Sequence, residues 1–170
     1  MDFEKTIKQF KENTVCERCA DLDNVLGGGT GKGLGDGLPR EPQKYILTGH
    51  RARVTKLAIH PMYNLVASAG EDAVIRIWDY EQGEHERTLK SHSGKVSYVA
   101  FSPNGQTLAS CATDMTIKLW SMQTFTVFKT LEGHEHEVSC VAFMNSGNFL
   151  LSCSRDETIR IWDVNLGTCI

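Results

Sequence analysis

Residues 133–163 read GHEHEVSCVAFMNSGNFLLSCSRDETIRIWD, and the same pattern of residues occurs twice more, earlier in the chain. A histidine, a serine, an aspartate and a tryptophan recur in this order, and each lies 42 residues from its counterpart in the next copy. The three sets are His50, Ser68, Asp72 and Trp78; His92, Ser110, Asp114 and Trp120; and His134, Ser152, Asp156 and Trp162. An uninterrupted period of this length indicates a repeat architecture.

Short runs rich in β-branched and aromatic residues fill each repeat and are separated by turn signals. The first run follows each histidine and reads VTKLAI, VSYVAF or VSCVAF. The second run reads LVAS, TLAS or FLLS, and the third, which ends the repeat, reads VIRIW, TIKLW or TIRIW. The segments 43–48 (QKYILT), 84–89 (EHERTL) and 125–131 (FTVFKTL) supply a fourth strand before each histidine. Four strands per period are typical of a β-propeller blade, so we predict an all-β fold with three blades of an incomplete ring.

Glycines mark the turn between the first and second strands in two of the three repeats. Gly105 in SPNGQ and Gly147 in MNSGN lie at equivalent places that suit a positive φ. The first repeat has Tyr63 at this place, so its turn must differ.

The recurring His, Ser and Asp could form either a nucleophilic triad or a structural network. Three identical triads in one chain, none of them in a G-x-S-x-G turn, argue against catalysis. A buried Trp N–H needs an acceptor, which Ser can provide while passing a hydrogen bond to His, and Asp can accept from the other imidazole nitrogen. We therefore predict structural tetrads and no catalytic residue.

The GH…D…WD pattern of these repeats resembles the WD-repeat family. Four dipeptides match it outright: Gly49-His50, Gly133-His134, Trp78-Asp79 and Trp162-Asp163. The second repeat departs from the pattern at two positions, where Ser91 replaces Gly and Ser121 replaces Asp. The neighbouring pattern residues, His92 and Trp120, are both present. The resemblance implies that each tetrad connects the three inner strands of one blade.

Within that family, residues 39–170 resemble the lissencephaly-type regulators of cytoplasmic dynein, which also serve as non-catalytic subunits of platelet-activating-factor acetylhydrolase. This resemblance rests on six segments: PREPQKYILTGHR, HERTLKSH, DMTIKLW, GHEHEVSCVAF, SRDETIRIW and GTCI. It implies a docking protein without enzymatic activity, located in the cytoplasm at microtubules and the centrosome. The implied partners are the dynein motor domain, dynein adaptors and acetylhydrolase catalytic subunits. The alternative is a general WD-repeat scaffold, such as a ubiquitin-ligase substrate receptor.

Two sets of loops emerge together on one face of a propeller, and they carry the candidate partner-binding residues. The loops before each first strand present Arg51, Arg53 and Lys95, and the turn after the second strand of the third repeat presents Arg155. The resemblance implies a binding role for Arg155, in SRD. Arg51 and Arg53 are chosen by location alone, and a role as a solvated rim residue is favoured at least as much for each of them.

The first forty residues differ in composition from the repeats. Residues 1–26 are predicted to be helical, as a short coiled coil that could support self-association or as a lone surface helix. Residues 27–42 form a linker rich in Gly and Pro. GTGKG within it fails as a phosphate-binding loop, because Leu26 and Gly33 stand where Gly and Ser or Thr are required. The three repeats then occupy about 43–84, 85–126 and 127–168.

Composition excludes several classes of ligand. Lys and Arg number 18 against 21 Asp and Glu, a net charge of -3, so no basic field favours nucleic acid. No apolar run is long enough to span a membrane.

The remaining cysteines and histidines do not form a metal site. Cys16 and Cys19 form a CxxC motif without a second pair. His60, His85 and His136 lack partners at metal-binding spacing, so solvated or turn roles are expected for these histidines. We expect no metal and no cofactor. Three blades leave two end faces exposed, so we also expect either a fragment or assembly with other chains.

Overall fold

In the computed structural model, residues 45–170 are described, and they form antiparallel β-sheets as the repeat pattern predicts. Eleven strands lie in this range: β1 (Val54–Ile59), β2 (Leu65–Gly70), β3 (Val74–Asp79), β4 (Glu84–Lys90), β5 (Val96–Phe101), β6 (Thr107–Ala112), β7 (Ile117–Ser121), β8 (Thr126–Leu131), β9 (Val138–Phe143), β10 (Phe149–Ser154) and β11 (Ile159–Asp163). The predicted helix at 1–26 and linker at 27–42 lie outside the described residues, as do Cys16 and Cys19.

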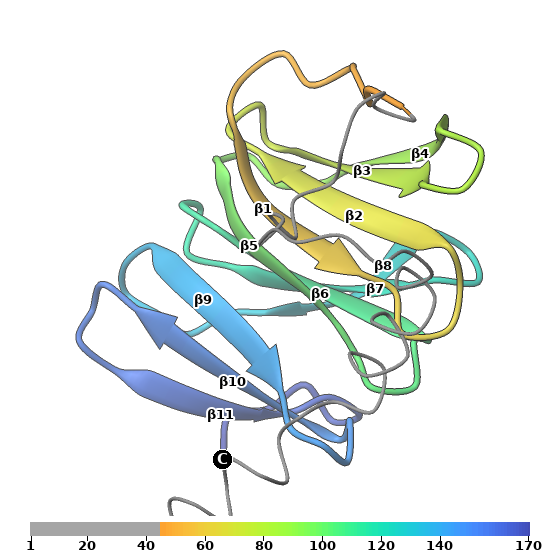
Figure 1. The fold of residues 1–170 in the computed structure, drawn as a ribbon. Helices are drawn as coiled ribbons and strands as arrows, with labels where there is room; N and C mark the ends of the chain where they lie inside the picture. The colour runs from red at the N-terminus through yellow and green to blue at the C-terminus, as the bar shows by residue number, and fades with distance from the viewer. Residues whose placement is uncertain (1–44) are drawn as a thin grey trace, which may run out of the picture. The chain divides into compact units, whose positions relative to one another are not determined.

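The strands form three sheets, one for each WD-like repeat, which we call the first, second and third blades. β1–β4 and β5–β8 are four-stranded meanders, and β9–β11 form a three-stranded sheet (Figure 1). After β11 the chain turns back, and an isolated bridge between Trp162 and Cys169 places the last residues where a fourth strand begins. The predicted all-β class with three propeller blades is confirmed.

The fourth strand of each complete sheet comes from the segment just before the next histidine. β4 and β8 correspond to the predicted EHERTL and FTVFKTL strands. The first and second blades therefore end inside the next predicted repeat, so the limits 43–84, 85–126 and 127–168 follow the sequence period and not the sheet boundaries.

The prediction of a strand at 43–48 is wrong for the residues that the structure describes, because 45–48 adopt no regular structure. A strand exists only where a neighbouring strand can satisfy its backbone N–H and C=O groups. β4 and β8 each complete the sheet of the preceding repeat, so by the same offset 43–48 would complete a sheet before the first blade, and the described residues 45–170 contain no such sheet. The side chain of Ile46 is consequently exposed.

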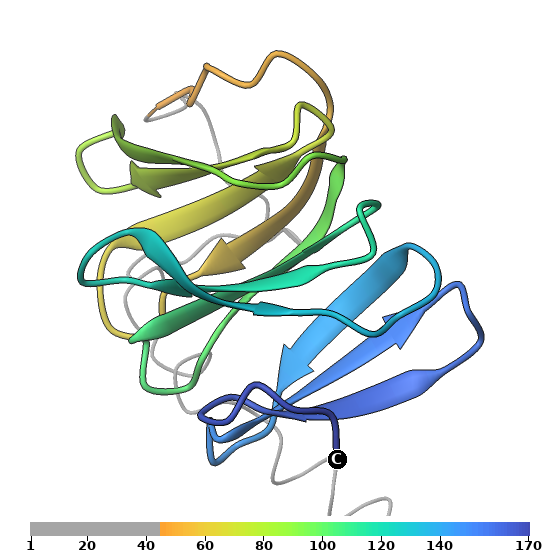
Figure 2. The same ribbon diagram turned by 180° about the vertical axis from the view of Figure 1, so that it is seen from behind.

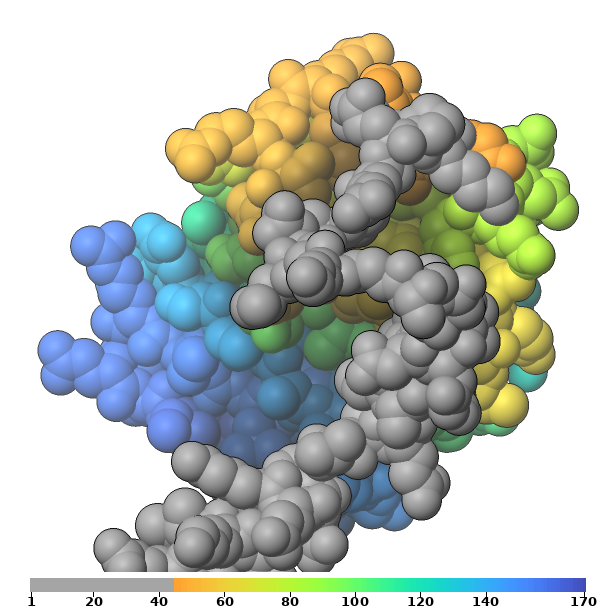
Figure 3. All heavy atoms as spheres, in the orientation of Figure 1, coloured from red at the N-terminus to blue at the C-terminus, as the bar shows by residue number. Residues whose placement is uncertain are grey.

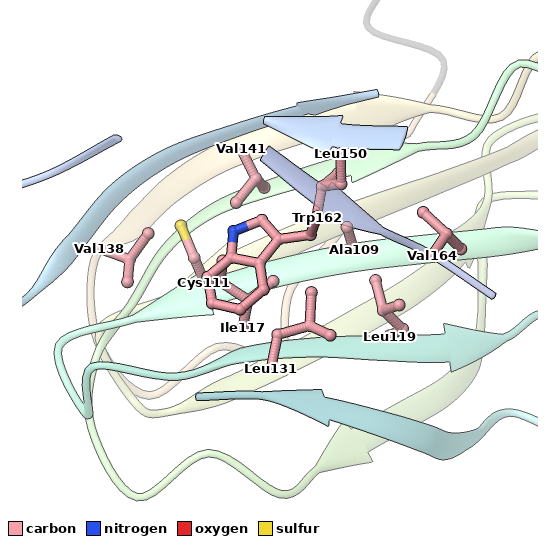
Figure 4. Close-up of a cluster of buried hydrophobic side chains, with 10 residues drawn as sticks. All are labelled: Ala109, Cys111, Ile117, Leu119, Leu131, Val138, Val141, Leu150, Trp162 and Val164. Carbon is pink, nitrogen blue, oxygen red and sulfur yellow. The ribbon is translucent and has the colours of Figure 1, made fainter. Parts of the chain in front are cut away.

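The apolar core lies between successive blades, where inward-facing side chains of two sheets interdigitate. The first interface buries Ala67, Ala69, Ile75, Ile77 and Leu89 of the first blade against Val96, Val99, Leu108 and Trp120 of the second. The second interface repeats this arrangement between the second and third blades, with the Trp162 indole between the two sheets (Figure 4). Packing between neighbouring blades therefore contributes to the stability of each blade, in addition to the hydrogen bonds between its own strands.

The turns after the first strands show why glycine recurs there. Gly105 and Gly147 adopt φ values of 70° and 74°, which glycine reaches without steric cost. In the first blade the buried His60 stabilises a different turn, since its Nδ1 accepts hydrogen bonds from Met62 N at 3.1 Å and Tyr63 N at 2.9 Å. Its Nε2–H is then free to donate to Gly105 O at 2.9 Å, which connects the first blade to the second.

Candidate partner-binding face and its tetrads

Each tetrad is assembled from four places in the repeat. The His lies in the loop before the first strand, the Ser in the second strand, the Asp in the following turn and the Trp in the third strand. In the second blade, Trp120 Nε1 donates to Ser110 Oγ at 2.8 Å, and Ser110 Oγ lies 2.8 Å from His92 Nε2. His92 Nδ1 lies 2.8 Å from a carboxylate oxygen of Asp114. The four side chains therefore form one continuous hydrogen-bonded chain.

Protonation states in this chain follow from burial and hydrogen bonding. Burial lowers the pKa of His92 below its ordinary value despite the neighbouring carboxylate. Burial by itself raises the pKa of Asp114, but hydrogen bonds from His92 and Thr116 outweigh it and hold that pKa below its ordinary range. A neutral His92 then donates from Nδ1 to an ionised Asp114 and accepts the Ser110 hydroxyl proton at Nε2.

The other two tetrads repeat these contacts. In the first blade the His50–Ser68 and Trp78–Ser68 distances are both 2.7 Å. In the third, Ser152 Oγ lies 2.7 Å from His134 Nε2 and 2.8 Å from Trp162 Nε1. The His–Asp distances are 3.0 Å for His50–Asp72 and 2.7 Å for His134–Asp156.

The tetrad serines are too deeply buried to act as nucleophiles on a substrate. Ser68, Ser110 and Ser152 are at most 3% exposed, and each hydroxyl is already engaged by an indole N–H and an imidazole. A nucleophilic serine must reach a substrate carbonyl, which these side chains cannot do. We propose that the tetrads are structural.

The tetrad aspartates also hold the loops of the candidate binding face, a contact that the sequence did not indicate. The backbone N–H after each histidine donates to the carboxylate: Arg51 N to Asp72 at 3.0 Å, Ser93 N to Asp114 at 3.1 Å and Glu135 N to Asp156 at 3.1 Å. Each carboxylate thereby fixes the loop before a first strand against the turn after the second strand. These bonds help to hold the pKa of Asp72 and of Asp156 below the ordinary value, although desolvation opposes them.

Threonines complete the turn in the second and third blades. Thr116 and Thr158 donate their hydroxyl protons to Asp114 and Asp156 at 2.8 Å and 2.7 Å, and Thr158 N donates to the same Asp156 oxygen at 2.9 Å. The only sequence signal for these contacts is the recurrence of Thr two residues after the Asp.

We use the name loop face for loops 50–53, 91–95 and 132–137 together with turns 71–73, 113–116 and 155–158. Figures 1 and 2 show these segments at the same end of the three sheets. Backbone hydrogen bonds join the two sets in every blade: Glu71 N to Arg53 O at 2.8 Å, Thr113 N to Lys95 O at 2.9 Å and Arg155 N to Glu137 O at 3.0 Å. The loop face is therefore a rigid platform.

Charged side chains project from this platform, and the four predicted binding residues are all exposed on it. Arg155 is 70% exposed and lies 3.5 Å from a carboxylate oxygen of Glu137. Lys95 lies 3.7 Å from Glu71. Exposed pairs at such distances contribute at most about 1 kcal/mol, so a partner can replace them at little cost.

Charge is distributed unevenly along the loop face. Among residues 45–170, no carboxylate lies within ion-pair distance of the guanidinium groups of Arg51 and Arg53 at the first-blade end, although Glu71 and Asp72 of the adjacent turn balance their charge. Glu135 and Glu157 are exposed beside Arg155 and make the third-blade end predominantly acidic. In Figure 3, side chains of the first (orange) and third (blue) blades stand out on the left of the view, where these loops lie.

The remaining polar candidates form no second site in the described range. His85 Nε2 lies 2.9 Å from Thr88 Oγ1, and the exposed His136 accepts from Glu137 N. Cys111 is buried between blades, which raises the pKa of its thiol well above the ordinary value. Residues 45–170 contain no cluster of His, Cys, Asp and Glu able to hold a metal ion. Within the same range, no helix has the length and apolar character needed to cross a membrane.

Comparison with known proteins explains the repeated geometry. The family described as "WD domain, G-beta repeat" matches residues 41–79, 83–121 and 125–163. The chain belongs to the WD-repeat family. Members of this family are generally interaction scaffolds without catalytic residues, and the buried tetrad serines are consistent with that class.

Two curated relatives share substantial identity with part of the chain. The Lissencephaly-1 homolog of Heterostelium pallidum is 44% identical over 89 residues, which cover 52% of this chain and 19% of the relative. The Lissencephaly-1 homolog of Dictyostelium discoideum is 53% identical over 79 residues, covering 43% of this chain and 19% of the relative. The matched region spans about a fifth of the length of these relatives.

Proposed function

We propose that this WD-repeat chain is a non-enzymatic regulator of cytoplasmic dynein that binds its partner through the loop face. Its likeness to two Lissencephaly-1 homologs over about half of the chain supports this function, together with the motif resemblance described above. Nuclear migration, mitotic spindle and centrosome function, and intracellular transport are the processes it would serve, in the cytoplasm at microtubules. Dynein adaptors and acetylhydrolase catalytic subunits are further proposed partners.

The observation that carries this proposal is the exposed, weakly paired guanidinium of Arg155 on a rigid platform. The backbone of Arg155 is held by its bond to Glu137 O, and the adjacent Asp156 is anchored in a tetrad. The side chain is nevertheless free to exchange Glu137 for a carboxylate of a partner, which a guanidinium can bind through two parallel hydrogen bonds. Arg51 and Arg53 supply two further exposed guanidinium groups at the first-blade end of the loop face, so acidic side chains of the dynein motor domain are the expected partners of these three arginines.

A binding measurement with purified dynein motor domain tests this proposal. The full chain should bind, and Arg155→Ala should weaken binding about tenfold, the loss of one exposed hot-spot arginine. Arg87→Ala is the matched control, because Arg87 is an exposed arginine of β4 that lies over the Phe125 ring and outside the loop face. Its affinity should equal that of the wild type.

Two results would count against different parts of the proposal. Absence of binding by the wild-type chain would refute the dynein assignment and leave the general scaffold, such as a ubiquitin-ligase substrate receptor. Equal affinities for the wild type and Arg155→Ala, with binding retained, would instead refute the role of the loop face. Thermal melts of both variants separate lost contacts from lost folding.

A further inference from the structure

The turn that follows the third strand is built in the same way in the first and third blades. Its first residue is the aspartate of the WD pair, Asp79 or Asp163. One carboxylate oxygen of Asp79 accepts hydrogen bonds from Glu81 N at 2.8 Å and from Gln82 N at 3.0 Å. Asp163 makes the same two bonds in the third blade, at 2.8 Å each. In both turns a carboxylate therefore satisfies two consecutive backbone N–H groups.

The second blade keeps the backbone of this turn but lacks the carboxylate, because Ser121 stands in place of the aspartate. Phe125 N donates to Ser121 O at 2.8 Å, as Gly83 N donates to Asp79 O at 2.9 Å in the first blade. Phe125 adopts a φ of 56°, in the same left-handed region as the 75° of Gly83. The backbone of the turn therefore has the same shape with and without the carboxylate.

Tertiary packing holds the second-blade turn in this shape. A positive φ is unfavourable for a residue with a side chain, so it persists only where surrounding contacts impose it. The Phe125 ring packs against the core between the first and second blades, and the Arg87 guanidinium lies over that ring, 5.8 Å from its centroid. The turn is consequently fixed before any ligand binds.

Two backbone N–H groups of the second-blade turn have no acceptor within residues 45–170. They belong to Gln123 and Thr124, the counterparts of the two residues that donate to Asp79. Because the backbone shape is shared, these N–H groups point toward Ser121. The Ser121 hydroxyl accepts neither of them, and no other residue of the described range does so. No side chain takes the place of the missing carboxylate.

The turn lies at the end of the second sheet opposite the loop face (Figures 1 and 2). A hollow of about 450 Å³ opens beside it, and no charged side chain lines this hollow. The side chains of Ser121, Gln123 and Gln106 form no hydrogen bond with other residues of the range 45–170. All lining residues belong to the second blade, which has a blade on either side, so neither end of the chain creates the hollow. The lining residues are Gln106, Thr107, Ser121, Gln123, Thr124 and Phe128.

We propose that this turn binds a carboxylate side chain from a segment of a partner protein, in place of the aspartate that the other two blades carry. The N–H groups of Gln123 and Thr124 donate to one carboxylate oxygen, and the Ser121 hydroxyl donates to the other. Hydrogen bonds to an ionised acceptor are roughly twice as strong as those between neutral groups.

A protein segment fits this site better than a small free carboxylate does. A free carboxylate of a few atoms makes too few contacts to bind tightly. A protein segment can in addition cover the Phe128 ring, which is 47% exposed at the edge of the hollow. The site is remote from the loop face, so this inference does not rest on the proposed function.

Nuclear magnetic resonance of the isotope-labelled full chain tests the site, with sodium acetate as the probe at constant ionic strength. Acetate should shift the amide signals of Gln123 and Thr124 downfield in a saturable way. Acetamide, which has the same shape without the charge, should not shift them. The signals of Glu81 and Gln82 should stay in place, because their N–H groups already bind Asp79. Signals of Gln123 and Thr124 that do not move, or that move equally with acetamide, would overturn the proposal.

Two reciprocal substitutions are the matched controls. Ser121→Asp supplies the carboxylate within the chain, so it should shift the two amide signals without acetate and abolish the response to acetate. It should also raise the melting temperature by about 2–4 °C. Asp163→Ser removes the carboxylate from the third-blade turn and should confer the acetate response on that turn. An acetate response that persists in Ser121→Asp, or that does not arise in Asp163→Ser, would also overturn the proposal.

A peptide probe distinguishes a protein segment from a small carboxylate. The acetylated and amidated pentapeptide Gly-Leu-Glu-Leu-Gly has a single carboxylate, on its glutamate side chain. It should bind at least about tenfold more tightly than acetate, because its other residues contact the rim of the hollow. Phe128→Ala should reduce this gain and leave the affinity for acetate unchanged. Equal affinities for the peptide and for acetate would overturn the assignment to a protein partner.

Discussion

Replacing Ser110 by alanine tests the tetrad most directly, because the Ser110 hydroxyl group links the buried Trp120 indole to the buried His92 imidazole. Ser110 is fully buried, and its Oγ accepts from Trp120 Nε1 at 2.8 Å and lies 2.8 Å from His92 Nε2. Alanine is smaller by one oxygen atom, so the substitution opens almost no cavity. It leaves the indole N–H and the imidazole nitrogen without partners in the protein interior.

The expected cost follows from these two orphaned groups. An unpaired buried donor or acceptor costs about 1–3 kcal/mol, so Ser110→Ala should lower the free energy of unfolding by about 2–6 kcal/mol. For a chain of this size the melting temperature should fall by roughly 4–24 °C. Urea denaturation followed by tryptophan fluorescence measures the change. Ser139→Ala, at an exposed serine of β9, is the control and should stay within about 0.5 kcal/mol of the wild type.

A second substitution identifies the mechanism. Trp120→Phe removes the indole N–H, so it should cost less in the Ser110→Ala background than in the wild type, by about 1 kcal/mol. If Ser110→Ala unfolds within about 0.5 kcal/mol of the wild type, or if the two substitutions are additive, the tetrad does not stabilise the blade as we propose.

Two further predictions concern the turn after the first strand and the effect of pH. Gly105→Ala should destabilise the protein by about 1–3 kcal/mol, since φ is positive and an added Cβ would lie 2.4 Å from the His60 ring. Gly147→Ala is the control with a similar φ but a nearest atom at 3.6 Å, so an equal cost at both sites would contradict the clash. Acidification should destabilise the fold, because the pKa values of His92 and Asp114 are lowered by folding from 6.5 and 3.8. Their contributions are complete above those values and are lost as pH falls, so urea midpoints that stay constant from about pH 7.5 to about pH 3 would refute this.

The repeat could be predicted from sequence because its evidence is local and occurs three times. A period of 42 residues, alternating strands and turn residues such as Gly105 and Gly147 each report on short segments of chain. The residues of the loop face could also be located, because the strand order of a meander decides at which end each loop emerges. None of this required knowledge of which segments meet in space.

Only the tertiary structure decided the features that depend on contacts between segments far apart in the sequence. Residues 45–48 have the composition of a strand, yet they form none because the described residues 45–170 contain no sheet before the first blade that they could join. His60 lies outside the repeat pattern, and only the approach of Gly105 from the next blade gives its second nitrogen a partner. The same holds for Ile159 and Ile77, which occupy equivalent positions but are 74% and 0% exposed. Sequence determines the chemistry that each position offers, whereas packing against another sheet determines whether that position is core or surface.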